Sequence, residues 1–171
     1  MRTPMRLDDF LALGETKHAE YYDGVCVMNP PTRQHERTVA VLRAEIEAAC
    51  PAGYEVLTGW GWMTSSGRRF EPDIMVCDTD SPDDDILRTP APLLVVEVSS
   101  PSTRSDDWGI KLSEYGHSGA GWYWLVDLEQ REIVIMENVG DRFVERARSR
   151  GRLTSPGPVP AAIDAALLPR R

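Results

Sequence analysis

The feature that most constrains the fold is a nearly unbroken apolar run, Leu93 to Val98, which contains one acidic residue, Glu97. Such a run is typical of a central β-strand that is covered on both faces. A carboxylate in that position costs several kcal/mol to desolvate unless a cation or hydrogen-bond donors meet it. We therefore expect a covered sheet that provides a partner for Glu97 in its interior.

The remaining pattern predicts two long helices among several short strands. Apolar residues recur every three or four positions over residues 32–49 and 105–118, which is the period of an amphipathic helix. Short β-branched and aromatic runs bounded by turn formers predict a hairpin over 19–28 and further strands at 54–57, 60–63, 70–77, 92–99, 122–126 and 133–136. This order predicts an α/β fold with a mixed central sheet flanked by helices.

Length and composition indicate one domain. The 171 residues, 42% of them hydrophobic, are enough for a single buried core. We assign residues 1–148 to that domain and expect residues 149–171, which contain Arg and Pro, to form an extended C-terminal tail. The cysteines, Cys26, Cys50 and Cys77, are odd in number and widely spaced, which argues against a disulfide framework and against a zinc site.

Charge limits the choice of partner. The net charge is −8, and the acidic excess lies in residues 1–141, whereas residues 142–171 are basic on balance. An acidic body repels a polyanion, so a nucleic acid needs a local basic patch or a bound cation. This argues against a non-specific DNA-binding protein, and the small basic segment suggests a homodimer or a restricted substrate. No apolar run reaches the ~20 residues of a membrane span, and the acidic N-terminal segment is unlike a signal peptide, so we expect a cytoplasmic protein without membrane contact.

A second acid stands at the head of another apolar strand. Asp73 follows Glu71 and Pro72 and precedes the run Ile74 to Val76. If the two strands are neighbours, Asp73 and Glu97 come close together, and close carboxylates repel unless one is protonated or a cation lies between them. Carboxylate oxygens suit Mg²⁺ or Mn²⁺. We therefore predict a metal site at Asp73 and Glu97.

Lys111 completes this group of candidates. The chain has 17 arginines and only two lysines, Lys17 and Lys111, so a lysine at this position suggests a need for a compact ammonium. Lys111 lies on the helix expected after the Glu97 strand. From there its ammonium can reach a nucleophilic water or a phosphate oxygen.

Structural roles remain open for each of these residues. Asp73, which follows a proline, can cap a turn. Glu97 and Lys111 can form an ion pair with no catalytic role, and Lys111 can pair with Asp107 at helical spacing on the surface. We favour a functional site because the two strand acids and the scarce lysine occur together.

Several motifs follow one another over about residues 6–145. They are Glu20 to Gly24, Asn29-Pro30, His35, Glu71-Pro72-Asp73, Val95 to Thr103, Asp106 with Lys111 and Tyr115, and Tyr123 to Asp127. This set resembles the Uma-two family of restriction-endonuclease-like bacterial proteins, which belongs to the PD-(D/E)XK nuclease superfamily. The resemblance implies a restriction-endonuclease-like α/β core with Asp73 and Glu97 as ligands of Mg²⁺ or Mn²⁺. It also implies an endonuclease that hydrolyses phosphodiester bonds in nucleic acid. We expect DNA as the partner, although the sequence leaves the choice between DNA and RNA open.

The sequence departs from the superfamily pattern at one position. That pattern has a lysine two residues after the glutamate, but Ser99 stands there in this chain. The resemblance implies that Lys111 supplies the ammonium from the following helix, and that His35, Ser99 and Asp106 are further candidate site residues. If Lys111 does not reach the acids, the site is degenerate and the protein is a non-catalytic binding or assembly module with a nuclease fold.

Overall fold

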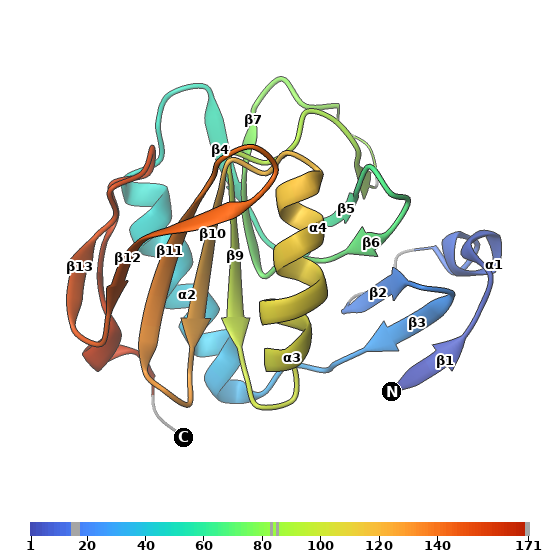
Figure 1. The fold of residues 1–171 in the computed structure, drawn as a ribbon, viewed down its shortest axis with the longest axis horizontal. Helices are drawn as coiled ribbons and strands as arrows, with labels where there is room; N and C mark the ends of the chain where they lie inside the picture. The colour runs from blue at the N-terminus through green and yellow to red at the C-terminus, as the bar shows by residue number, and fades with distance from the viewer. Residues whose placement is uncertain (15–17, 83, 85, 170–171) are drawn as a thin grey trace.

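Within the described residues, the strands form two six-stranded sheets and one small two-stranded sheet; Figure 1 shows their arrangement. The computed structural model describes residues 1–14, 18–82, 84 and 86–169. The sheet with the longer strands, called the larger sheet below, has the order β12-β11-β10-β9-β7-β4. Its bounds are β4 (Tyr54–Leu57), β7 (Ile74–Asp78), β9 (Leu94–Ser99), β10 (Trp122–Asp127), β11 (Glu132–Asn138) and β12 (Phe143–Ser149). The N-terminal sheet has the order β1-β3-β2-β6-β5-β8, with bounds β1 (Arg2–Pro4), β2 (Ala19–Tyr22), β3 (Val25–Met28), β5 (Gly61–Met63), β6 (Arg69–Phe70) and β8 (Ile86–Leu87).

The two predicted long helices are present, and the second differs from a regular α-helix. α2 (Arg33–Ala48) begins after Thr32, whose side chain accepts the backbone N–H of His35 as an N-cap. The second helical segment joins α3 (Arg104–Asp106), a π-helical turn η1 (Asp107–Lys111) and α4 (Leu112–His117). π-Helical turns inside α-helices are frequent at functional sites. A short helix, α1 (Leu7–Leu11), precedes β2.

β9 is the central strand that the apolar run predicts. It pairs in parallel with β10 and antiparallel with β7, and all six of its residues are buried. The larger sheet is therefore mixed, as expected. Because side chains alternate along a strand, Val96 and Val98 face one side of the sheet while Val95 and Glu97 face the other.

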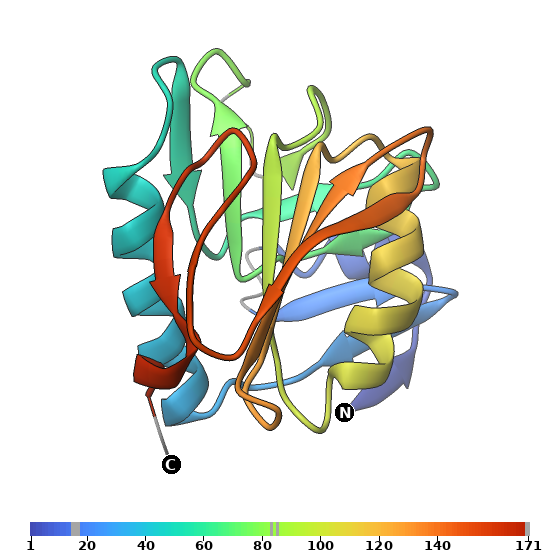
Figure 2. The same cartoon turned by 60° about the vertical axis from the view of Figure 1, so that its left-hand side comes forward.

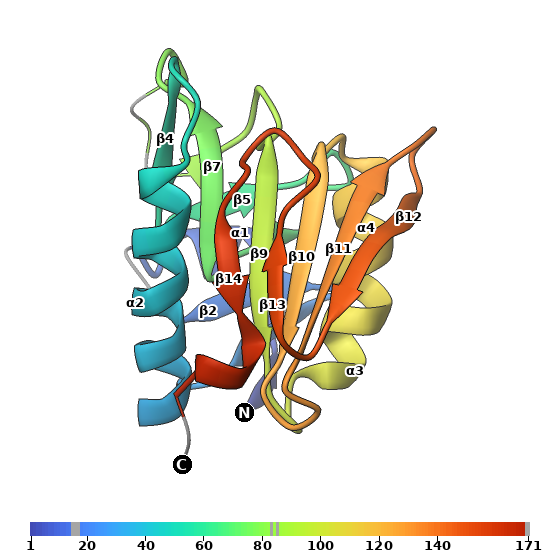
Figure 3. The same cartoon turned by 90° about the vertical axis from the view of Figure 1, so that its left-hand side faces the viewer.

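The larger sheet lies between α2 on one face and α4 on the other (Figures 2 and 3). Each face carries its own core. Leu42 and Ile46 of α2 pack on the face that includes Val96. Tyr115 of α4 packs on the opposite face with Val95, and side chains of the N-terminal sheet complete this second cluster. Glu97 thus points toward the space shared by α4 and the N-terminal sheet, which decides where its partner must come from.

The C-terminal segment is not an extended tail, so this prediction was wrong for the described residues 149–169. β13 (Arg152–Thr154) pairs with β14 (Ala162–Asp164), and a 3₁₀ turn, η2 (Ala165–Leu167), follows. Val159, Ile163 and Leu168 are buried in the same core as α2. The prolines of this segment indicated an unpaired chain. Its scattered apolar residues instead pack in the core between α2 and the sheet, and no local sequence pattern reveals this packing. The assignment of residues 1–148 to a self-contained domain stays a prediction.

Two arginines of the basic segment, Arg146 and Arg148, lie on β12, an edge strand of the larger sheet, and Arg150 follows directly after this strand. Arg146 pairs with Glu137, and Arg148 and Arg150 both pair with Glu132. Since carboxylates pair with these three guanidiniums, this edge of the sheet does not present them as a free basic patch for phosphates.

Two further expectations concern the whole chain. Within the described ranges, none of the helices combines the length and the apolar character that crossing a membrane requires. The three cysteines are free thiols, with Cys26 and Cys77 buried and Cys50 partly exposed.

Candidate active site

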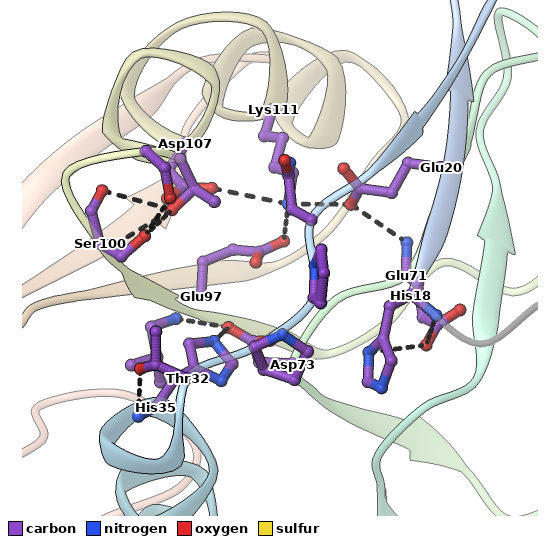
Figure 4. A pocket seen from close by; sticks show the side chains of 16 residues that line it. His18, Glu20, Thr32, His35, Glu71, Asp73, Glu97, Ser100, Asp107 and Lys111 are labelled. Atoms are coloured by element: carbon purple, nitrogen blue, oxygen red, sulfur yellow. Dashed lines mark hydrogen bonds and ion pairs between the residues drawn. The ribbon is translucent and has the colours of Figure 1, made fainter. Parts of the chain in front are cut away.

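A pocket lies where the N-terminus of α2, the end of β9, the segment α3-η1 and the N-terminal sheet meet (Figure 4). Its volume is about 90 Å³, and one water molecule takes up about 30 Å³ in the liquid. The titratable residues of its lining are His18, Glu20, His35, Glu71, Asp73, Glu97, Asp107 and Lys111. The pocket therefore has room for a few waters or a hydrated ion, inside a wall dominated by carboxylates.

The two strand acids and the scarce lysine come together in this pocket. The ammonium of Lys111 lies 3.1 Å from Oε1 of Glu97, and the hydroxyl of Tyr115 donates to the same oxygen at 2.7 Å. Asp73 lines the pocket beside them (Figure 4). Lys111 thus reaches Glu97 from the following helical segment and shares the pocket with Asp73, as expected if Lys111 replaces the lysine that the superfamily pattern has at the position of Ser99. The roles of the three residues stay predictions.

Asp73 is held at the head of β7 by two hydrogen bonds. β7 runs antiparallel to β9, so Asp73 comes beside Val98, whose backbone N–H donates to Oδ2 at 2.7 Å. Nε2 of His35, from the first turn of α2, lies 3.1 Å from the same oxygen. Burial lowers the pKa of His35, but the hydrogen bond and charge of Asp73 outweigh burial and raise it. His35 therefore belongs to the pocket as the partner of Asp73.

Lys111 is surrounded by three carboxylates rather than one. Its ammonium lies 2.9 Å from Oε1 of Glu20, 3.1 Å from Glu97 and 3.5 Å from Oδ1 of Asp107, and its side chain is only 7% exposed. The pair with Asp107 therefore exists, but it is buried and not on the surface. Sequence reasoning gave Glu20 no role, because an acid in a short hairpin strand carries no local sign of burial.

Burial shifts the protonation of this cluster. Loss of water raises the pKa of Glu97 well above its usual range; Lys111 opposes this shift, whereas Asp73, Asp107 and Glu20 add to it. Loss of water also raises the pKa of Glu20 and of Asp107. Burial lowers the pKa of Lys111, but Glu20 and Glu97 outweigh burial and raise it, so the ammonium stays charged. The cluster contains more acids than one ammonium neutralises, which favours a further cation.

The other candidate residues from the sequence lie differently. Ser99 is buried at the end of β9 and is not part of the pocket lining found among the described residues. Asp106 also stands outside that lining, because it accepts hydrogen bonds from Arg2 and from the hydroxyl of Tyr22. Its neighbour Asp107 lines the pocket instead, since successive helical residues point in different directions.

The donor set fits one hydrated ion better than a protein cage. In the described part of the chain, no group of three or more His, Cys, Asp or Glu side chains is arranged to hold a metal. Mg²⁺ keeps several of its waters and usually binds through one or two carboxylates. Asp73 and Glu97 offer two such carboxylates to a pocket with acidic excess, so they fit Mg²⁺ or Mn²⁺ that retains part of its water shell.

The sequence matches the family model of Uma2, described as "Putative restriction endonuclease", over residues 7–166. The chain belongs to the Uma2 family. This confirms the family that the motifs resemble, and the match includes most of the C-terminal segment that packs on the core. Nucleases with a restriction-endonuclease-like fold generally use divalent metals.

A solved structure has the same fold as this chain. The structure is described as a "putative nuclease belonging to DUF820" from Anabaena variabilis ATCC 29413. It shares a TM-score of 0.77 and 18% sequence identity with this chain, and the alignment covers 96% of this chain and 97% of that chain. At this identity the likeness shows the fold alone, which is the predicted nuclease-type α/β architecture. No curated protein matches the chain.

Proposed function

We propose that this Uma2 protein is a metal-dependent nuclease that hydrolyses phosphodiester bonds in the cytoplasm, in DNA rather than RNA. The observation that carries the proposal is the meeting of Asp73, Glu97 and Lys111 in one pocket, although they come from two strands and a helical segment. Family membership supports the same class of reaction. An acidic body that repels nucleic acid also favours a site where a cation mediates contact with phosphate.

Asp73 and Glu97 would hold Mg²⁺ or Mn²⁺ through carboxylate oxygens. A bound divalent ion would polarise a phosphate oxygen and lower the pKa of an adjacent water. Lys111 donates protons from Nζ, so it can orient the attacking water or neutralise a phosphate oxygen. Tyr115 holds Oε1 of Glu97, and His35 holds Oδ2 of Asp73, so both carboxylates would be presented to an ion in a fixed orientation.

The test is cleavage of duplex DNA, single-stranded DNA and RNA with Mg²⁺, Mn²⁺ or a chelator. We expect metal-dependent cleavage, with DNA as the better substrate. Asp73→Asn and Glu97→Gln should each lower the rate about 100-fold or more. Asp80→Asn, at an exposed loop residue, and Glu114→Gln, at a buried glutamate outside the pocket lining, are matched controls that should keep the rate. Cleavage that persists in both site variants contradicts the proposal.

A non-catalytic binding module is the second candidate function. The ion pair between Lys111 and Glu97 favours it, because it satisfies a buried carboxylate without a metal. Thermal unfolding with and without Mn²⁺ separates the two candidates. A nuclease site stabilises the protein at 100 times the Kd by about 2.7 kcal/mol, or about 5 to 10 °C, and Glu97→Gln abolishes the shift. A binding module without a metal site shows no shift in the wild type.

A further inference from the structure

The ammonium of Lys111 lies closer to Glu20 than to Glu97. The distances to Oε1 are 2.9 Å for Glu20 and 3.1 Å for Glu97, and all three side chains are at least nine-tenths buried. Figure 4 shows the ammonium between these two carboxylates, with Glu20 reaching it from the N-terminal sheet and Glu97 from β9. Lys111 therefore connects the N-terminal sheet, through Glu20, with the larger sheet, through Glu97.

Glu20 is itself fixed in place. Its Oε1 accepts the backbone N–H of Glu71 at 3.4 Å, and Glu71 precedes Asp73 by two residues on the same chain segment. Arg69 and the backbone N–H of His18 both contact the carboxylate of Glu71. These contacts connect Glu20 to the segment that carries the second acid of the pocket.

Glu97 uses a single oxygen for its protein partners. Lys111 and Tyr115 both contact Oε1, and no hydrogen bond or ion pair within the described ranges involves Oε2. A second strong partner for the ammonium limits its approach to Glu97, because a lysine ammonium has only three protons to donate. The third acid, Asp107, lies at 3.5 Å and is a weaker partner.

We propose that Glu20 is a positioning residue, which anchors the ammonium of Lys111 between the sheets and leaves Oε2 of Glu97 available to a divalent ion. The part of the inference that concerns the divalent ion rests on the proposed function. The anchoring of the Lys111 ammonium by Glu20 does not depend on it. Without the charge of Glu20, the ammonium turns fully to Glu97 and competes with the ion for that carboxylate. Glu20 thus acts on the reaction through Lys111.

The position of the ammonium can be measured directly, because the chain contains only two lysines. Protein labelled with ¹⁵N-lysine gives two Nζ resonances, and Lys111→Met identifies the one from Lys111. We expect Glu20→Gln to shift this resonance and to accelerate exchange of its protons with water about tenfold or more. Asp107→Asn, which removes a more distant charge, should shift it less. An unchanged Lys111 resonance in Glu20→Gln overturns the inference.

Binding of Mn²⁺, followed by calorimetry, tests the consequence for the ion. We expect Glu20→Gln to raise the Kd for Mn²⁺ about 10-fold or more, whereas Glu114→Gln, a buried glutamate paired with Arg68, leaves it unchanged. If the ammonium moves in Glu20→Gln but the Kd does not change, the inference fails and the proposed function stands. If the wild type binds no Mn²⁺, the proposed metal site fails, and the resonance alone decides the anchoring.

Two measurements cover the case in which Glu20→Gln does not fold. In the wild type, nuclear Overhauser contacts between the ε-methylene of Lys111 and the γ-methylene of Glu20 are expected, and their absence overturns the inference. Glu20→Asp keeps the charge on a shorter side chain. Glu20→Asp should therefore shift the Lys111 resonance while the protein retains part of its affinity for Mn²⁺. If Glu20→Asp loses as much Mn²⁺ affinity as Glu97→Gln, the anchoring role is contradicted.

Discussion

The hydroxyl of Tyr115 donates to Oε1 of Glu97 at 2.7 Å, and both side chains are buried. The two residues come from different elements, α4 and β9, and meet because Glu97 faces the side of the sheet that α4 covers. The phenol thus holds the only acidic side chain of β9 in one orientation. It connects the packing of the core directly to the geometry of the pocket.

Removal of this hydroxyl should affect the pocket more than the fold. Tyr115→Phe loses one hydrogen bond to a carboxylate, which contributes about 1.5 to 3 kcal/mol to stability, and we also expect weaker Mn²⁺ binding. Tyr123→Phe is the matched control, because its buried hydroxyl donates to the backbone carbonyl of Asp107 instead. Calorimetry and urea unfolding measure both effects. Equal Mn²⁺ affinity in the two variants contradicts a role for Tyr115 in orienting Glu97.

Lys111→Met should destabilise the protein at pH 8. The substitution leaves Glu20, Glu97 and Asp107 buried without their shared counter-ion, and breaking a buried ion pair by removing one partner costs about 3 to 5 kcal/mol. Lys111→Arg keeps the charge on a larger, planar group, so a smaller loss is expected. Urea unfolding measures the free energies. A Met variant as stable as the wild type shows that the ammonium is not needed to hold these acids.

Glu114 predicts a specific dependence of stability on pH. Burial alone raises the pKa of this carboxyl, but hydrogen bonds from Ser66 and Arg68 outweigh burial and lower it below the usual 4.5. A lowered folded-state pKa stabilises the protein above the unfolded-state pKa, and this contribution disappears as the pH falls through the folded value. The free energy of unfolding of the wild type should therefore exceed that of Glu114→Gln by about 1.5 to 3 kcal/mol at pH 7. Urea unfolding from pH 7 to pH 3 should show this difference shrinking below pH 4.5, and a constant difference contradicts the prediction.

The C-terminal segment should contribute to the stability of the core. Ile163 is 3% exposed and packs in the cluster of α2, so Ile163→Ala should cost about 2 to 5 kcal/mol. Leu167, four residues later, is 80% exposed, and Leu167→Ala should change stability by no more than about 0.5 kcal/mol. Thermal unfolding distinguishes the pair. An extended tail, as the prolines suggested, predicts no loss from either substitution.

Two glycines of the second helical segment should respond to alanine in opposite directions. At Gly116, an added Cβ lies 2.9 Å from the backbone oxygen of Asp141, so Gly116→Ala should destabilise the protein by about 1 to 3 kcal/mol. At Gly109, no atom lies within 4 Å of the added Cβ, and Gly109→Ala should stabilise by about 0.5 to 1 kcal/mol. Chemical unfolding of both variants tests the signs. If Gly116→Ala increases stability, the prediction is contradicted, and the backbone near Asp141 moves to accommodate the added Cβ at little cost.

The elements with strong local signals were predictable. α2 occupies Arg33–Ala48 where the apolar period predicted 32–49, because its N-cap, Thr32, and its period lie within the element itself. β9 occupies Leu94–Ser99 within the predicted strand 92–99, because its apolar run is also a local signal. The pairing of β13 with β14 was not predictable, since three-residue strands carry no period and become stable only through their partners.

The kind of chemistry at the candidate site was predictable from the sequence, but the full set of residues that form the site was not. Asp73, Glu97 and Lys111 stand out in the sequence by position or scarcity, and they share the pocket. Glu20 looks like an ordinary hairpin acid, and only the packing of the N-terminal sheet brings it to Lys111. Asp106 and Asp107 are equivalent in sequence, and the rotation of the helical segment selects the second for the pocket.

The sequence by itself determined the buried central strand, the long amphipathic helix and the need of Glu97 for a partner, because hydrophobic period and the cost of burying charge act on residues close together in the chain. Only the tertiary structure decided which groups meet that need. Charges interact across space, and the distances from Lys111 to Glu20, Glu97 and Asp107 depend on how the two sheets and the helical segment pack. That packing results from apolar contacts between elements that are far apart in sequence, so no local pattern contains it.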